Sequence, residues 1–181
     1  MIARAIEAGV NRFYLPNIDS ESIEGMLALE KQYPENCFPM IGLHPCSVNE
    51  NAESELETVS AWLEKRKFAA VGEIGIDLYW EKENLELQQM AFRKQIEMAL
   101  QHELPIVIHC RDSFPEVLAV LKEYKGSGLT GILHCFTGSL AEAEELIDMG
   151  FLLGIGGVAT FKNGGLEPVI KNIDLKHFVL E

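Results

Sequence analysis

Three features are missing from this sequence of 181 residues, and each absence removes a class of protein. No apolar run approaches the roughly 18 residues that a membrane-spanning helix needs, so we expect no membrane partner. The first ten residues lack the long apolar core of a secretory signal. None of the four cysteines forms a Cys-x-x-Cys pair, which predicts reduced thiols in a cytoplasmic protein.

Basic residues are also scarce. The sequence has 15 Lys and Arg against 28 Asp and Glu, which gives a net charge of −13. Such a surface does not attract nucleic acid or an anionic membrane through a broad basic groove. A polyanionic substrate would have to be drawn by local cations, either metal ions or a few Lys and Arg side chains.

The glycine pattern that binds nucleotide phosphates is absent from the start of the chain. The segment after the first apolar run reads "LPNIDSESIEG" and has no G-x-G-x-x-G spacing, so we expect no nucleotide cofactor. No linker, low-complexity tract or block of like charges divides the chain. The length suffices for one sizeable core, and we predict a single domain over residues 1–181.

What the sequence does contain is a regular alternation of apolar runs and amphipathic helical patterns. A helix with no strand before it is expected at the start, over 1–9. Strands are predicted over 12–18, 37–45, 68–77, 104–110, 130–136, 151–159 and 176–181, with helices over 21–35, 52–66, 84–103, 114–125, 139–150 and 166–173. Ser20 and Ser139 are placed to cap two of these helices, and Gly150 to end one.

Near-continuous apolar strands that alternate with helices indicate a parallel sheet covered by helices. A closed (β/α)₈ barrel and an open doubly wound sheet both fit that pattern. Polar residues fall at several different strand ends, which favours the barrel. The predicted fold is therefore α/β, an incomplete (β/α)₈ TIM-type barrel with seven of the eight strands present.

Four of these polar residues recur about once per strand–helix unit. They are His44, Glu73, His109 and His134, with separations of 73−44=29, 109−73=36 and 134−109=25 residues. Each separation fits one strand–helix unit, which takes about 30 residues or more across its full βαβ span. In a barrel, positions that recur in this way meet at one mouth.

Imidazoles and a carboxylate at one barrel mouth can form a divalent metal site. Glu73 lies inside an apolar strand, where an unpaired carboxylate is costly, so a metal or a fixed cation is its expected partner. We take Glu73, His109 and His134 as the candidate ligands. A bound ion would activate water by lowering its pKa to about 7.

Three further residues have alternative interpretations. Asp77 fits a role at the site as well as it fits a loop cap or a salt bridge. Arg111 would either hold a phosphate in a bidentate manner or pair with a neighbouring carboxylate. His44, beside Pro45, would contact substrate or be structural.

Several other polar residues are expected to lie outside the site. We predict structural roles for His102 and His177. Lys162, in the glycine-rich segment 154–165, is expected to face solvent, although it could also bind an anion. Cys110 and Cys135 directly follow His109 and His134. Alternation along a strand would turn both thiols to the opposite face, where they would pack.

The motifs at these positions resemble the TatD family of metal-dependent deoxyribonucleases, a group of amidohydrolase-like barrels. The resemblance rests on "GLHP", "VGEIGID", "IVIHCRD", "ILHCFTGS" and the terminal "VLE", which occur in family order. It implies cleavage of phosphodiester bonds in DNA with one or two divalent ions, whether Mg, Mn or Zn. It also implies metal ligation by Glu73, His109 and His134, catalytic roles for Glu73 and Arg111, and substrate contacts from His44, Arg111 and Asp77.

The sequence also departs from the family pattern. The family begins with a strand that carries a His-x-His pair, whereas this chain starts at the helix that would follow it. The family also has an aspartate shortly after the closing strand, beyond Glu181. We therefore expect a chain truncated at both ends, with only part of the family's ligand set.

Two other interpretations stay open: an amide, ester or lactone hydrolase of the same barrel type, and a catalytically inactive fragment. Oligomeric state, and exonuclease against endonuclease action, are open as well.

Overall fold

The computed structural model describes residues 1–80 and 82–181. Its strands are β1 (Phe13–Leu15), β2 (Cys37–Pro39), β3 (Val71–Asp77), β4 (Ile106–Arg111), β5 (Gly131–Leu133), β6 (Phe151–Ile155) and β7 (Phe178–Leu180). Its α-helices are α1 (Ile2–Glu7), α2 (Ile23–Gln32), α3 (Ala52–Lys65), α4 (Leu85–Gln101), α5 (Phe114–Glu123), α6 (Leu140–Asp148) and α7 (Glu167–Asn172). No helix in the described ranges has the length and apolar character needed to cross a bilayer.

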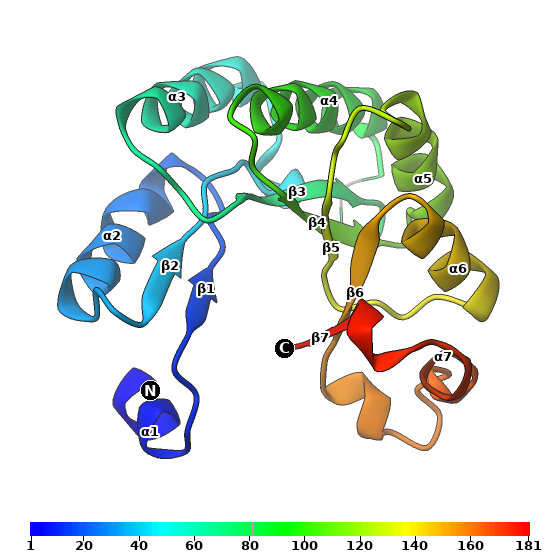
Figure 1. The fold of residues 1–181 in the computed structure, drawn as a ribbon. Coiled ribbons are helices and arrows are strands. Elements are labelled where there is room, and N and C mark those ends of the chain that lie inside the picture. Colours follow the sequence, from blue (N-terminus) through cyan, green and yellow to red (C-terminus); the bar gives the residue numbers. More distant parts are fainter. Residues whose placement is uncertain (81) are drawn as a thin grey trace.

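The strands pair in parallel and in sequence order. One ladder is β1–β2, the other is β3–β4–β5–β6–β7, and a single bridge between Ile41 and Val71 joins them. The strands curve, and helices α2 to α7 lie on the outer side of that curve (Figure 1). A doubly wound sheet reverses its strand order and carries helices on both faces, so this arrangement is the predicted incomplete barrel.

The main core lies between the central strands and the helices outside them. Ile74 and Ile76 of β3 and Ile106 and Ile108 of β4 are completely buried, as is Phe92 of α4. These side chains belong to one contiguous apolar cluster that also includes residues of α5, α6 and α7. The packing fixes the positions of β3 and β4, which carry the residues of interest.

One helix cap is as predicted and one is not. Ser139 caps α6 in a capping box with Glu142, and Gly150 follows the helix with φ of +91°. Ser20, however, does not act as a cap. Asp19 accepts the N–H of Ser22 instead, and the Ser20 hydroxyl donates to Glu55 at 2.7 Å.

The fifth strand is shorter than the sequence pattern predicted. β5 ends at Leu133, and the following residues form a turn in which Cys135 has φ of +46°. The prediction that Cys135 packs inside is therefore wrong, because alternation holds only within a strand and this thiol is exposed. Cys110 lies within β4 and packs against the core, and burial raises its pKa to about 11.

Candidate metal centre

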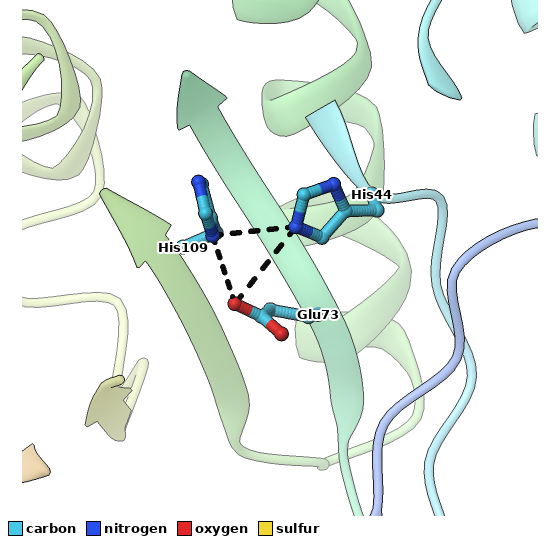
Figure 2. A group of neighbouring side chains, drawn as sticks. All are labelled: His44, Glu73 and His109. Atoms are coloured by element: carbon cyan, nitrogen blue, oxygen red, sulfur yellow. Dashed lines mark hydrogen bonds and ion pairs between the residues drawn. The ribbon is translucent and has the colours of Figure 1, made fainter. Parts of the chain in front are cut away.

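Glu73 of β3 lies at the centre of a cluster of imidazoles. Its Oε1 atom is 3.0 Å from Nδ1 of His109, 3.8 Å from Nε2 of His134 and 4.0 Å from Nε2 of His44. Figure 2 shows Glu73, His109 and His44, which approach one another from β3, β4 and the segment after β2. The three histidines predicted from the sequence therefore surround the carboxylate, which is only 13% exposed.

A glycine two residues after Glu73 permits this close approach of β3 and β4. Gly75 is the register partner of His109, and a Cβ atom at Gly75 would collide with the backbone carbonyl of His109. Its φ of +143° is also one that side-chain-bearing residues rarely adopt. Glycine here therefore keeps the two strands near enough for His109 to meet Glu73.

A buried aspartate fixes the orientation of His109. Nε2 of His109 lies 2.9 Å from Oδ2 of Asp77, whose side chain is 1% exposed. A carboxylate accepts only, so Nε2 of His109 donates to Asp77, and Nδ1 is the nitrogen that faces Glu73 and that a cation can take in place of its hydrogen. The buried side chain thus makes the loop-cap and salt-bridge contacts that were one interpretation of Asp77, and its contact with substrate stays a prediction.

His134 has a carboxylate partner of its own. Nδ1 of His134 lies 2.9 Å from Oε2 of Glu181, and that oxygen also accepts the backbone N–H of Cys135 at 2.9 Å. Nε2 of His134 is thereby left on the side of Glu73. Gly154 of β6 provides the space for Glu181, since a Cβ atom there would collide with the Glu181 carboxylate.

His44 is oriented differently from the other two histidines. Its Nδ1 accepts the backbone N–H of Cys46 at 3.1 Å, which leaves the hydrogen of the neutral ring on Nε2. Nε2 is 3.3 Å from Nδ1 of His109. Burial and the neighbouring His109 lower the pKa of His44, which keeps the ring neutral. His44, Glu73 and His109 have the proximity of a metal site, but His44 could ligate only by giving up the bond from Cys46.

The electrostatics of the cluster favour a cation. Burial opposes the charge of Glu73, but the hydrogen bond from His109 and the charges of His134 and His109 outweigh it and lower the pKa of Glu73. The pKa of His109 is raised, because its bonds to Glu73 and Asp77 outweigh burial. Once the two imidazoles lose the hydrogens that face Glu73, one ionised carboxylate and two imidazole nitrogens form a donor set that fits a divalent ion.

Comparison with known proteins places the chain in a family. The family model described as TatD related DNase matches residues 1–181. This chain belongs to the TatD family. It is 34% identical to the uncharacterized metal-dependent hydrolase YabD of Bacillus subtilis, a match that covers 100% of this chain and 71% of YabD. The 3'-5' ssDNA/RNA exonuclease TatD of Erwinia tasmaniensis is 31% identical, over 92% of this chain and 64% of that protein.

Solved structures of the TatD family share the fold. The crystal structure of YjjV, a TatD homologue from Escherichia coli K12, superposes with a TM-score of 0.91 at 31% identity. The superposition covers 99% of this chain and 70% of YjjV. A TatD family hydrolase from Entamoeba histolytica gives 0.86 at 24% identity and supports the fold alone. The family is one of metal-dependent hydrolases. This chain matches about 70% of the length of their TIM barrel.

Arg111, at the end of β4, does not follow the prediction that it pairs with a neighbouring carboxylate, and its contact with a phosphate stays a prediction. Within residues 1–80 and 82–181, no carboxylate lies within ion-pair distance of its guanidinium. The guanidinium instead covers the ring of Tyr79, 3.9 Å from the ring centroid, and lies 5.7 Å from that of Trp80. The face of the guanidinium is thus occupied, whereas its N–H edges can still bind an anion.

The remaining sequence candidates lie outside the cluster around Glu73. His102 follows α4 and pairs with Glu64 of α3 at 3.4 Å, which agrees with a structural role. His177 is half-buried before β7, and Lys162 is exposed.

Sequence reasoning missed two parts of the site. Glu181 was named only as the residue beyond which the family has its aspartate, although its position at the end of the last strand was a usable signal. The aromatic pair Tyr79 and Trp80 could not be predicted as part of the site from the sequence. Its contact with the Arg111 guanidinium depends on the conformation of the loop after β3.

Proposed function

We propose that this chain is a TatD-type phosphodiesterase that hydrolyses DNA with the help of a divalent ion. The family assignment supports metal-dependent hydrolysis, and some relatives carry the name of a nuclease. The observation that carries the proposal is the position of Glu73 Oε1, within 4.0 Å of nitrogen atoms on three different histidines. A carboxylate enclosed in this way is suited to hold a cation that faces a phosphate.

Glu73, His109 and His134 would hold the ion. Mg, Mn and Zn all accept mixed carboxylate and imidazole ligands, and the cluster would hold one or two such ions. When bound, such an ion supplies an activated water and neutralises charge on the phosphate. Asp77 and Glu181 would keep the two imidazoles in the tautomers that ligation requires.

His44 and Arg111 would act on the substrate. The Nε2–H of His44 faces the cluster and is available to donate to a non-bridging phosphate oxygen. The N–H edges of Arg111 would stabilise the negative charge that develops on phosphorus oxygens during attack. Both residues would therefore favour the transition state without binding the ion themselves.

The test combines metal analysis with cleavage assays. The purified chain should hold divalent metal in stoichiometric amount by elemental analysis, and Mn²⁺ or Mg²⁺ should stimulate cleavage of single-stranded oligonucleotides. Glu73→Gln should abolish both properties. Glu24→Gln, which makes the same charge change at an exposed position on α2, should alter neither.

The outcome separates the proposal from the other two interpretations. Faster hydrolysis of simple carboxyl esters or lactones than of oligonucleotides, measured side by side, would instead assign an amide, ester or lactone hydrolase on the same barrel. Absence of bound metal together with absence of cleavage would show an inactive chain. Full activity in Glu73→Gln would refute the proposed centre itself.

A further inference from the structure

Two large aromatic side chains lie exposed in the loop that follows β3. Tyr79 is 47% exposed and Trp80 is 65% exposed, and their rings meet edge to face with centroids 4.7 Å apart. An exposed tryptophan beside an exposed tyrosine leaves apolar surface in water, a cost that an interaction site explains. Neither residue has a part in the proposed metal chemistry.

Hydrogen bonds order the backbone that carries this pair. The N–H groups of Tyr79 and Trp80 both donate to Oδ1 of Asp77 at 2.9 Å. The N–H of Leu78 donates to the carbonyl of Arg111 at 2.9 Å. The Arg111 guanidinium then covers one face of the Tyr79 ring. We call Tyr79, Trp80 and Arg111 the aromatic shelf.

The aromatic shelf adjoins the metal centre. Asp77, whose Oδ1 holds the loop, contacts His109 through Oδ2 at 2.9 Å. Asp77 and Arg111 are also register partners across β3 and β4, the two strands that supply Glu73 and His109. The buried side chain of Asp77 thus separates the shelf from His109, a candidate metal ligand. The shelf and His109 both lie towards the carboxyl ends of β3 and β4.

We propose that the aromatic shelf stacks a nucleobase of single-stranded nucleic acid, next to the phosphodiester held at the metal centre. The inference rests on the proposed function and names its substrate class. Every base offers a π face to an aromatic ring, and a guanidinium adds cation–π attraction. In a duplex those faces are covered by neighbouring bases, so the shelf selects single strands.

The charge of the chain supports this occupant. With a net charge of −13, the molecule has little general attraction for a phosphate backbone. Contacts to the base must then supply much of the affinity, and stacking supplies it without basic residues. An anionic membrane would be repelled by the same charge.

The experiment measures binding separately from cleavage. Fluorescence anisotropy would follow the binding of a labelled oligothymidylate and of an abasic oligonucleotide of the same length, at low salt. The chain should bind oligothymidylate at least about fivefold more tightly, since stacking of one base is worth that factor or more. Tyr79→Leu/Trp80→Leu keeps apolar bulk and removes the rings, and should abolish the preference. Tyr79→Phe/Trp80→Phe keeps the rings and should retain it.

The proposal that the shelf stacks a nucleobase is wrong if the unmodified chain binds the two oligonucleotides equally. It is also wrong if the folded Leu variant keeps the full preference for oligothymidylate. Circular dichroism of both variants excludes misfolding as the cause of a loss. A retained preference with no metal-stimulated cleavage leaves the shelf in place and contradicts only the phosphodiesterase proposal.

Discussion

Asp77 and His109 are joined by a contact of 2.9 Å between Oδ2 and Nε2, deep in the wall behind the cluster. The aspartate is 1% exposed, so the contact is shielded from solvent. Its effect is to hold the hydrogen on Nε2 of His109, so that Nδ1, on the side of Glu73, is the nitrogen that can exchange its hydrogen for a cation. A single buried side chain thereby decides which nitrogen of His109 is available to a cation.

Asp77→Asn should weaken the binding of divalent metal about 10- to 100-fold, as loss of such a partner usually does. An asparagine can keep its carbonyl oxygen towards the N–H groups of Tyr79 and Trp80, which turns its amide N–H₂ towards His109. The imidazole must then accept at Nε2 and carry its hydrogen on Nδ1. Isothermal titration with Mn²⁺ measures the change. Asp148→Asn, at an exposed position on α6, is the matched control, and unchanged affinity in Asp77→Asn would contradict the positioning role.

Gly154→Ala should disturb His134 through Glu181. The new methyl group would occupy the space of the Glu181 carboxylate and come within 3.1 Å of the backbone nitrogen of Cys135. Overpacking of this kind costs about 1–3 kcal/mol in stability, and a displaced Glu181 no longer orients His134. Urea denaturation and Mn²⁺ titration should both show a loss. Gly156→Ala, where the nearest atom would be the Cys135 sulfur at 3.7 Å, should show neither.

His44→Gln should separate substrate contact from metal ligation. Because Nδ1 accepts from Cys46, we expect the variant to keep its metal stoichiometry and affinity. Loss of a hydrogen bond to a charged phosphate costs about 1.5–3 kcal/mol, which corresponds to a fall of about 10- to 100-fold in kcat/KM. Elemental analysis and steady-state kinetics on one oligonucleotide provide the comparison. Loss of metal from the variant would identify His44 as a ligand instead.

The ion pair between Glu30 and Arg66 should make stability depend on pH. Two hydrogen bonds of 2.6 Å join α2 to the end of α3, and the bond from Arg66 lowers the pKa of Glu30 below 4.5. A lowered pKa in the folded state stabilises the fold above the unfolded pKa, and the contribution disappears as pH falls through the folded value. Glu30→Gln should therefore cost about 0.5–1 kcal/mol at neutral pH. Its difference from the parent in urea titrations should vanish in acid, and a constant difference at every pH would contradict this account.

The order of elements and the convergence of the site were predictable from the sequence. Alternating apolar runs and helical patterns give parallel strands in chain order, and residues spaced once per unit then meet at one end. Glu73, His109 and His134 come together for that reason. The apolar surroundings of Glu73 were the strongest single signal, since a carboxylate there needs a cation.

The finer features depend on contacts between segments that local pattern does not encode. Asp19 rather than Ser20 caps the 3₁₀ turn before α2, because Glu55 of α3 accepts the Ser20 hydroxyl. β5 stops before His134, and the N–H of Cys135 donates to Glu181, 46 residues further along the chain. The burial of Asp77 likewise follows from the packing of β3 against β4.

The two oxygens of Asp77 face different neighbours, one towards His109 and one towards the loop of Tyr79 and Trp80. A rigid body with two contacts transmits displacement between them. Binding of a base at the aromatic shelf should therefore alter the affinity of the metal centre for its ion. Binding of the ion should alter the affinity of the shelf for the base by the same factor. A strand lying on the rings would tighten the hold on the ion, and a loaded ion would tighten the hold on the strand.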